Sequence, residues 1–479
     1  MVLSIPHIIH AFELILYLDM SMNATTLKSI VNQTIVVLIS VILYWFFAYD
    51  LVRIEYVKLL TLYALLFSLY IVLIRSRTFS FRSLAIIAFL FRAVFILAIP
   101  NLSQDFYRFI WDGRMILEGF NPYLYTPQSF LLHQEFPVAQ AELLYEGMGS
   151  LNGSHFTNYP PLNQLCFFIA SLFTGNSIIG SVVVLRLIII AADFGVLIYG
   201  KKLLNKLGLN IMNIFWYILN PFVIIELTGN LHFEGVMMFF LVLSLYLFHV
   251  NKWVRSAMFF ACSVSMKLIP LIFLPLYIKA FKKHSENDRI DFVKPHWFYL
   301  ITGSITLILF LPFYSAQFIH NYTKTVGLWF QKFEFNASVY YVFREIGFLF
   351  RGFNEIAIIG KILPVMVILF IIFMAVFRTN STTRKLITNM LLVMSVYYFT
   401  STTVHPWYIS TLLILSVFTR FRFPLIWSFV IVLSYLAYAN EGYTENLYLV
   451  ALEYLIVFSV FLFELLKKKP IEIKRSQNT

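Results

Sequence analysis

The stretch SLAIIAFLFRAVFILAI (residues 83–99) is followed closely by QDFYRFIWDGR (residues 104–114), so a long apolar segment opens into a dense polar one. Two carboxylates, two arginines and four aromatic rings fall within the second stretch. The apolar stretch has about the length that crosses a bilayer core. A cluster of acids, bases and rings at the mouth of such a segment favours a site for a polar substrate over a simple helix boundary.

The composition of the whole chain agrees with a membrane protein. Its 479 residues are 60% hydrophobic, and the mean hydropathy is +0.79. A soluble domain cannot bury that much apolar surface, so we predict an all-α polytopic membrane protein that forms one integral membrane domain over residues 1–479. The formal charge of +12 is explained by basic cytoplasmic loops, and nucleic acid is not an expected partner. The two cysteines, Cys166 and Cys262, lie in apolar runs and are expected to act as small hydrophobes.

Apolar segments of roughly bilayer length recur along the chain, and we expect about 12–14 spans. They fall at about 32–49, 56–74, 82–99, 178–199, 211–227, 235–250, 254–281, 296–314, 357–377, 386–402, 406–419, 423–439 and 447–466. Residues 254–281 are either one bent span or a pair of half-length helices that turn at Lys267–Pro270. Residues 1–30 and 158–173 are predicted as helices that lie along the membrane interface.

Basic residues collect in alternate loops, which sets the orientation by the positive-inside rule. This places both termini in the cytoplasm of a cell membrane and leaves two large loops, 100–157 and 315–356, on the outer face. The outer loops carry mixed acids, bases, histidines and aromatics, whereas the inner loops carry plain strings of bases. We therefore predict an outer-face site that borders the lipid bilayer and takes a substrate with a polar head and an apolar tail.

Each candidate residue of this site also has a purely structural explanation. Asp105 is in a position to cap a helix, and Asp112 is spaced to pair with Arg108 on one helix face. Lys267 is placed to extend its amine to the interface, and His232 and Glu234 can simply mark the end of a span. The sequence His405-Pro406-Trp407-Tyr408 also suits an aromatic belt.

Cofactor motifs are absent from the sequence. It contains neither a phosphate-binding P-loop nor a dinucleotide-binding glycine pattern, so we expect no ATP-driven role. His232-Phe233-Glu234 is too short a motif to define a metal site. No cofactor is expected to be obligatory, and dependence on a divalent metal is left open.

Several motifs occur in the order found in one enzyme family. They are the Asp105–Arg114 stretch, GFNPY at 119–123, YPPL at 159–162, Asn220-Pro221 with His232, KLIP at 267–270, FEFNAS at 333–338 and HPWY at 405–408. Together they resemble the bacterial polyprenyl-phosphate-mannose-dependent mannosyltransferases of the GT-C superfamily. The resemblance implies a GT-C-type helical bundle, an active site at its outer face and a polyprenyl-phosphate-linked sugar donor. It also implies that the acid of the first large outer loop, here Asp105, activates the acceptor hydroxyl.

The expected reaction is the inverting transfer of a hexose, in particular mannose, from the lipid-linked donor to a hydroxyl of a glycan or glycolipid. Asp105 is the predicted catalytic base. Substrate-binding roles are predicted for Arg108, Trp111, Asp112, Arg114, Asn121, Tyr159, His232, Glu234, Lys267, His405, Trp407 and Tyr408. Among these, Lys267, the two arginines and His405 are candidates to stabilise the leaving phosphate, and the aromatics are candidates to stack on sugars or line a lipid groove.

Three other functions remain open. A flippase or transporter of lipid-linked glycans needs polar residues along a path through the midplane, whereas here they gather on one face. An O-antigen ligase or polymerase also works at the outer face but uses a pyrophosphate-linked donor, for which more outer arginines are expected. A catalytically inactive scaffold is the third alternative. The glycosylation sequon Asn101-Leu102-Ser103 lies beside the proposed site, which favours a host without that modification, such as a bacterium.

Overall fold

The chain folds as a bundle of helices, and a computed structural model describes residues 24–467 apart from 77, 282–292, 332, 440, 441 and 443. The first half contains α2 (Ala24–Tyr49), α3 (Tyr56–Arg75), α4 (Phe81–Val94), α5 (Asp105–Leu117), α6 (Pro127–Leu132), α7 (Ala141–Gly153), α8 (Pro161–Thr174), α9 (Ile178–Lys206), η1 (Ile211–Ile214), α10 (Phe215–Ile218), α11 (Pro221–Val223) and η2 (Ile224–Gly229). The second half contains α12 (Glu234–His249), α13 (Trp253–Met266), η3 (Ile269–Lys279), α14 (Val293–Phe310), η4 (Leu311–Phe313), α15 (Ala316–Gln331), α16 (Val339–Arg351), α17 (Ile356–Phe377), α18 (Thr383–Thr400), η5 (Pro406–Tyr408), α19 (Ile409–Val417), α20 (Phe423–Val430), η6 (Ile431–Ala439) and α21 (Leu447–Leu466).

Many of these helices are apolar enough to lie in a membrane. Within the described residues, 5 helices are long enough to cross it, and the bent pair Ile211–Ile218 and Pro221–Gly229 makes a sixth candidate. Shorter apolar helices lie in most of the other predicted spans: Gln33–Tyr49, Glu234–His249, Ile269–Lys279, Pro406–Val417 and Phe423–Ala439. A further short apolar helix, Pro161–Thr174, lies in the segment predicted as an interfacial helix. The chain is therefore a polytopic helical membrane protein, as predicted. The expected number of spans stays a prediction, and residues 1–23 of the proposed N-terminal interfacial helix lie outside the described part.

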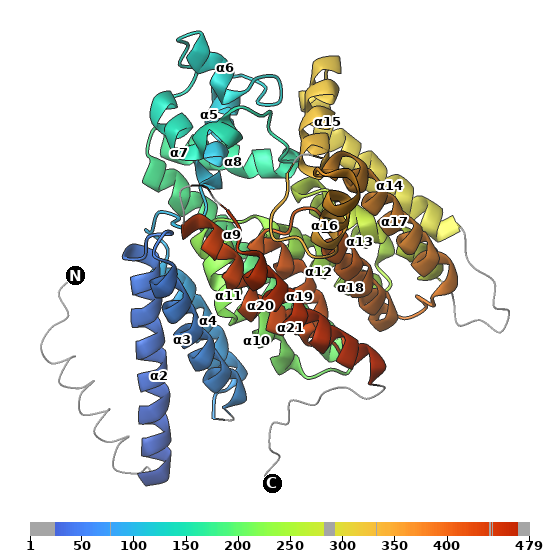
Figure 1. Cartoon of the computed structure of the whole chain (residues 1–479). Helices are drawn as coiled ribbons and strands as arrows, with labels where there is room; N and C mark the ends of the chain where they lie inside the picture. The colour runs from blue at the N-terminus through green and yellow to red at the C-terminus, as the bar shows by residue number, and fades with distance from the viewer. Residues whose placement is uncertain are drawn as a thin grey trace, which may run out of the picture.

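A helical cap lies at one end of the bundle. The predicted outer loop 100–157 is folded into α5, α6 and α7, which stand together with α8 at the top of the view in Figure 1. The second predicted outer loop, 315–356, forms α15 and α16, and α15 rises beside the cap in the same view. Gly113 explains how closely α5 approaches α8, because a Cβ there would come within 2.2 Å of the Phe167 carbonyl oxygen.

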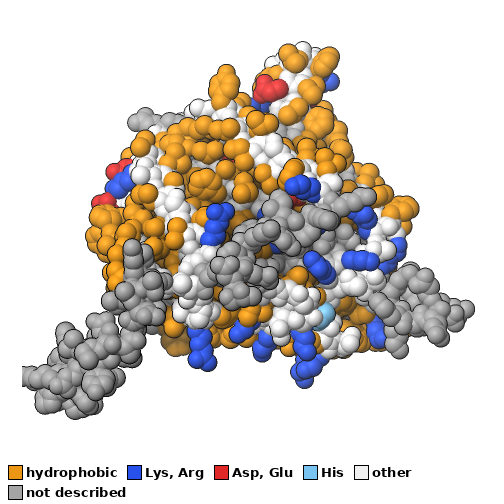
Figure 2. Space-filling model, turned by 90° about the horizontal axis from the view of Figure 1, so that it is seen from below, with side chains coloured by type: hydrophobic (Ala, Val, Ile, Leu, Met, Phe, Trp, Pro, Cys, Tyr) orange, Lys and Arg blue, Asp and Glu red, His pale blue; other side chains and the backbone are white. Residues whose placement is uncertain are grey.

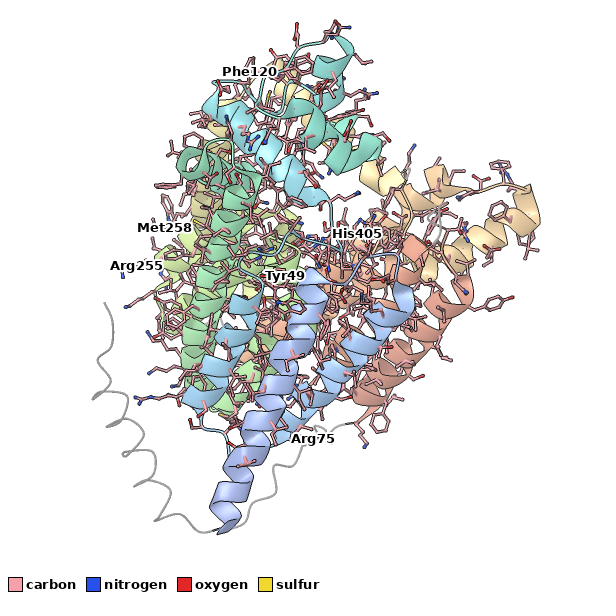
Figure 3. All side chains as sticks on the ribbon, turned by 90° about the vertical axis from the view of Figure 1, so that its left-hand side faces the viewer. Tyr49, Arg75, Phe120, Arg255, Met258 and His405 are labelled. Atoms are coloured by element: carbon pink, nitrogen blue, oxygen red, sulfur yellow. The ribbon has the colours of Figure 1, made fainter. Side chains whose placement is uncertain are left out.

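Basic side chains lie at the other end. Figure 2 shows the molecule from below, and the visible part of this face carries far more Lys and Arg than Asp and Glu. Several helices end or begin with a base near this side, as Arg75 does at the end of α3 and Lys206 at the end of α9. In Figure 3, Arg75 is far from Phe120, which belongs to the cap. The predicted orientation expects a basic face of this kind on the cytoplasmic side, and the orientation itself stays a prediction.

Buried arginines connect the helices inside the bundle. Arg92 on α4 donates to Asp193 on α9 over 2.7 Å and to the Ile218 carbonyl over 2.7 Å. Arg186 on α9 donates to the carbonyls of Ile96, Thr228 and Gly229, at 2.8–2.9 Å. These carbonyls lie where the backbone leaves regular α-helical geometry. An unpaired carbonyl in an apolar interior costs several kcal/mol. Arg186 therefore stabilises the broken helix that ends at Gly229.

The stretch 254–281 breaks at Lys267, which agrees with the two-helix alternative. Helix α13 ends at Met266, and Lys267 has extended backbone angles, φ −150° and ψ 139°. Pro270 follows within the first turn of η3, where its missing N–H is tolerated. The break brings the lysine side chain out of the helix at the level of the cap.

Candidate functional site

Four distant parts of the chain meet where the bundle joins the cap. They are the start of α5 with Asp105, the segment before and at the start of α12 with His232 and Glu234, the break at Lys267, and the loop before η5 with His405. Figure 3 shows His405 between the bundle and the cap, at about the level where Tyr49 ends α2. Each of these four parts of the chain therefore contributes at least one predicted site residue.

A lysine–glutamate ion pair lies at the centre of this site. The Lys267 ammonium contacts Glu234 Oε1, and the other carboxylate oxygen of Glu234 is buried with no hydrogen-bond partner in the described part of the chain. The Glu234 side chain is 3% exposed, whereas that of Lys267 is 23% exposed. Lys267 also lies 5.8 Å from the centre of the Tyr408 ring. The Lys267 side chain is thus paired with Glu234 and still partly exposed.

Asp105 is the first residue of α5, and it lies within electrostatic range of this pair. Burial raises the pKa of Asp105 above its ordinary value; the charge of Lys267 opposes the shift, and that of Glu234 adds to it. The nearby Tyr159 hydroxyl also favours the ionised carboxylate. Gln104, not Asp105, occupies the N-cap position of the helix, and its side chain caps nothing. A carboxyl group that holds its proton more tightly than usual suits a general base.

Stacked rings form one wall beside the pair. Trp407 is sandwiched between His232, at a centroid distance of 3.7 Å, and His405, at 4.6 Å. Phe335 stacks on the other side of His405 at 5.3 Å, and its backbone bonds to Thr402 and Val404 hold it there. Both faces of Trp407 are covered, so a sugar can reach only its edge. Stacking on Trp407 stays a prediction that this geometry does not favour.

Both histidines in the stack are neutral. Burial, helped by the charge of Lys267, lowers the pKa of His405 to about 3. Burial and the charges of Lys267 and His405 lower the pKa of His232 well below its ordinary value. A neutral imidazole can still donate one hydrogen bond, and His405 Nδ1 is buried with no partner among the described residues. His405 therefore offers the site a hydrogen-bonding group rather than a charge, and its contact with a ligand stays a prediction.

The other predicted residues have partners within the protein, in the cap. Arg108 forms a buried ion pair with Asp112 over 2.8 Å and donates to the carbonyls of Asn152 and His155. Arg114 donates to the Ala139 carbonyl over 2.5 Å, and Asn121 donates to the Phe313 carbonyl over 3.0 Å. The ion pair between Arg108 and Asp112 is the purely structural explanation given above for Asp112.

The predicted aromatics form two groups, one inside the cap and one beside the Lys267–Glu234 pair. Trp111 is 1% exposed and packs near Phe130 inside the cap. Tyr159 is partly buried and close to Asp105, and Tyr408 lies beside Lys267. Substrate contacts by the buried cap residues stay predictions, and the structure gives each of these residues a packing or hydrogen-bonding role.

Some polar residues near the site were not predicted as members of it. Glu226 on η2 accepts a 2.8 Å hydrogen bond from Tyr435 and lies 3.9 Å from His232 Nε2. Arg53 in the turn between α2 and α3, and Asn230 after η2, both bond to the backbone just before Asp105. A single base in a short turn carries no sequence signal beyond that of a flanking charge. Among the described residues, no three His, Cys, Asp or Glu side chains gather as a metal site would require, and metal dependence stays open.

Comparisons with known proteins agree with the predicted resemblance. The model of the family described as alpha-(1->6)-mannopyranosyltransferase, N-terminal domain, matches residues 19–282, more than half of the chain. An alpha-(1->6)-mannopyranosyltransferase A from Mycobacterium tuberculosis is 22% identical over 226 residues, 47% of this chain and 41% of the relative. Its namesake from Corynebacterium glutamicum is 25% identical over 187 residues, 38% of this chain and 36% of the relative. The matches thus span less than half the length of these curated relatives. The matched segment nevertheless contains Asp105, Glu234 and Lys267, and the chain belongs to the alpha-(1->6)-mannopyranosyltransferase family.

Proposed function

We propose that this protein transfers mannose from a polyprenyl-phosphate mannose to a hydroxyl of a glycan or glycolipid acceptor, at the outer face of a cell membrane. The observation that carries the proposal is the approach of Asp105 to the Lys267–Glu234 pair, which puts a base beside a cation. The family match supports mannose as the sugar and an α-(1→6) bond as the product, because its relatives bear that name. It also favours transfer over the flippase and ligase alternatives.

The reaction is a single displacement at the anomeric carbon. The acceptor oxygen attacks C1 of mannose while its proton passes to the Asp105 carboxylate. The bond between C1 and the phosphate oxygen breaks, and its electron pair stays on the departing polyprenyl phosphate. One displacement inverts the anomeric carbon, so an α-linked product requires a β-linked donor. The phosphate leaves as an anion and needs no general acid.

Lys267 is the proposed cation for the donor phosphate. Its side chain is partly exposed beside Asp105, and a phosphate that approaches it can share the ammonium with Glu234. The neutral His405 adds a hydrogen bond without adding charge. The attraction between phosphate and cation grows as the leaving group becomes more negative, so it favours the transition state over the bound donor.

The distribution of charge supports the orientation. The basic face in Figure 2 suits the cytoplasm under the positive-inside rule, and the cap and the site then face outward. A nucleotide sugar is confined to the cytoplasm, whereas a lipid-linked sugar can be presented on the other side of the membrane. The proposed donor and the proposed orientation therefore depend on each other.

The test uses the purified protein in detergent or liposomes, with radiolabelled polyprenyl-phosphate mannose and a manno-oligosaccharide acceptor. We expect mannose to move to the acceptor in an α-(1→6) bond, and GDP-mannose to give no product under the same conditions. Linkage analysis of the isolated product identifies the bond. Direct turnover of GDP-mannose without a lipid intermediate contradicts the proposed donor, and another linkage contradicts the proposed product.

A further inference from the structure

The backbone of Leu102 is held from two sides, three residues before Asp105. Its N–H donates to Asn230 Oδ1 over 3.1 Å, and its carbonyl accepts from Arg53 Nη1 over 3.3 Å. Leu102 is 3% exposed and Asn230 is 1% exposed, so water does not substitute readily for either bond. Two elements far apart in sequence, the α2–α3 turn and the segment after η2, thus fix one peptide.

The neighbouring residues extend this attachment. The Asn101 side-chain amide donates to the carbonyls of Phe47 over 2.7 Å and Leu51 over 3.0 Å, at the end of α2. Both of its N–H groups are used, which leaves the sequon asparagine no free position for a glycan. On the other side, the Asp105 N–H donates to Ser103 Oγ over 3.3 Å. The chain from Asn101 to Asp105 therefore has little freedom to move.

Arg53 and Asp105 share one aromatic neighbour, Tyr438. Its guanidinium is 4.4 Å from the centre of the Tyr438 ring, and the charges of both Arg53 and Asp105 act on that tyrosine. No described carboxylate lies within ion-pair distance of Arg53. The contacts of this arginine therefore serve the Leu102 carbonyl and the ring rather than a salt bridge.

We propose that Arg53 and Asn230 are positioning residues, which set the place of the Asp105 carboxylate by fixing Leu102. The inference rests on the proposed function, because it assigns Asp105 as the base. Helix α5 packs closely on α8 at Gly113, and the two bonds to the Leu102 peptide hold the chain just before the first turn of the helix. A displacement of about 1 Å in a reacting group can cost roughly 100-fold in rate.

The principal test is Arg53→Gln, measured in the mannose-transfer assay beside a matched control. Lys58→Gln removes one positive charge from the same part of the chain, where Lys58 pairs, among the described residues, with Asp50 at 2.8 Å and Glu55 at 3.0 Å. We expect Arg53→Gln to lower kcat by roughly 10- to 100-fold with little change in the donor KM. Arg53→Lys should restore part of the rate, since it keeps one charged donor, and Lys58→Gln should match the unmodified protein.

A second measurement separates positioning from other roles. If Arg53 acts only through Asp105, Arg53→Gln should cause no further loss in a protein that already carries Asp105→Asn. An added loss there, or a raised donor KM with kcat unchanged, overturns the proposal and makes Arg53 a substrate contact or a general structural residue. Unchanged kinetics of Arg53→Gln overturn it as well.

Misfolding and failure of the proposed function can both be told apart from failure of the inference. Thermal unfolding of each variant shows whether it is folded, and if Arg53→Gln is not, the smaller loss expected for Arg53→Lys is tested in the same two backgrounds. If Asp105→Asn keeps its activity, the assignment of Asp105 fails whatever Arg53 does. If Asp105→Asn is inactive while Arg53→Gln is normal, only the positioning role fails.

Discussion

Replacement of Lys267 by methionine should separate the two roles that the structure gives to this residue. The change keeps the length of the side chain and removes its charge. It leaves Glu234, which is 3% exposed, with neither carboxylate oxygen bonded, because Oε2 already lacks a partner. Breaking a buried ion pair in this way costs about 3–5 kcal/mol. The partial exposure of Lys267, at 23%, puts the expected loss near the lower end, about 3 kcal/mol.

The double variant Lys267→Met with Glu234→Gln isolates the contribution to donor binding. It removes both charges, so most of the lost stability should return, since no unpaired carboxylate remains buried. Donor use should stay poor, because a charge-assisted hydrogen bond to the phosphate contributes about 1.5–3 kcal/mol. This corresponds to a fall of roughly 10- to 100-fold in kcat/KM for the donor.

The assays are thermal unfolding of the purified protein and steady-state transfer at varied donor concentration. Lys58→Met is the matched control, because Lys58 forms a more exposed ion pair, of a kind that contributes at most about 1 kcal/mol. A double variant that uses the donor with normal kcat/KM refutes the phosphate role and leaves Lys267 as the counter-ion of Glu234. A single variant that is as stable as the Lys58→Met control refutes the argument from burial.

Four further predictions concern the base, the broken helix and the orientation. Asp105→Asn should lower the transfer rate by ~100- to 10,000-fold. It should not lower stability, because burial disfavours the charged carboxylate that the change removes. Retention of more than about a tenth of the rate contradicts the role of Asp105 as base. Because burial raises the pKa of this base, the rate should rise with pH through a value above that of an ordinary aspartate, and a pH–rate profile checks this. Arg186→Met should lower stability by at least about 3 kcal/mol through three unpaired carbonyls, whereas Arg82→Met, at an exposed position, should change the melting temperature little. A membrane-impermeant thiol reagent should label a cysteine placed at Gln128 and not one placed at Asn287, and the reverse result rejects the orientation.

The helices of the bundle were largely predictable from the sequence, because their length and composition follow from the bilayer. The predicted span 447–466 coincides with α21, where the apolar run stops at Lys467. The predicted span 82–99 is longer than α4, which ends at Val94. Pro100 has no N–H to continue the helix, and the Ile96 carbonyl accepts a hydrogen bond from Arg186 on another helix instead. Hydropathy contains no information about that arginine.

The predicted span 211–227 shows the same limit in another way. It is a pair of helices bent by 49°, because Pro221 cannot donate within a continuous helix and the Asn220 side chain accepts from the Phe222 N–H instead. The motif containing both residues was recognised in the sequence, but the break was not predicted. Proline is tolerated in many membrane helices, so the bend depends on the neighbours that take up the free carbonyls.

The sequence predicted which residue types form the site, but not which of these residues face the site and which pair inside the cap. Charge and position located Asp105, Lys267 and His405 at the ends of separate helices, and the structure gathers them. Arg108 and Asp112 belong to the same sequence cluster as Asp105, yet they pair inside the cap. The residues of α5 that face the site and those that face α8 are chemically alike, so only the packing of the helices separates them.

The ring stack of His232, Trp407, His405 and Phe335 has a thermodynamic consequence. Rings of this kind turn about only two side-chain bonds each, and here each ring is already pressed against another. Their order is therefore established when the protein folds and not when a substrate arrives. Little conformational entropy remains for this wall to lose on binding, so more of the contact energy appears as affinity and shape selectivity. If the proposed site binds its substrate against this wall, a substrate that does not match it is not accommodated by a simple side-chain rotation.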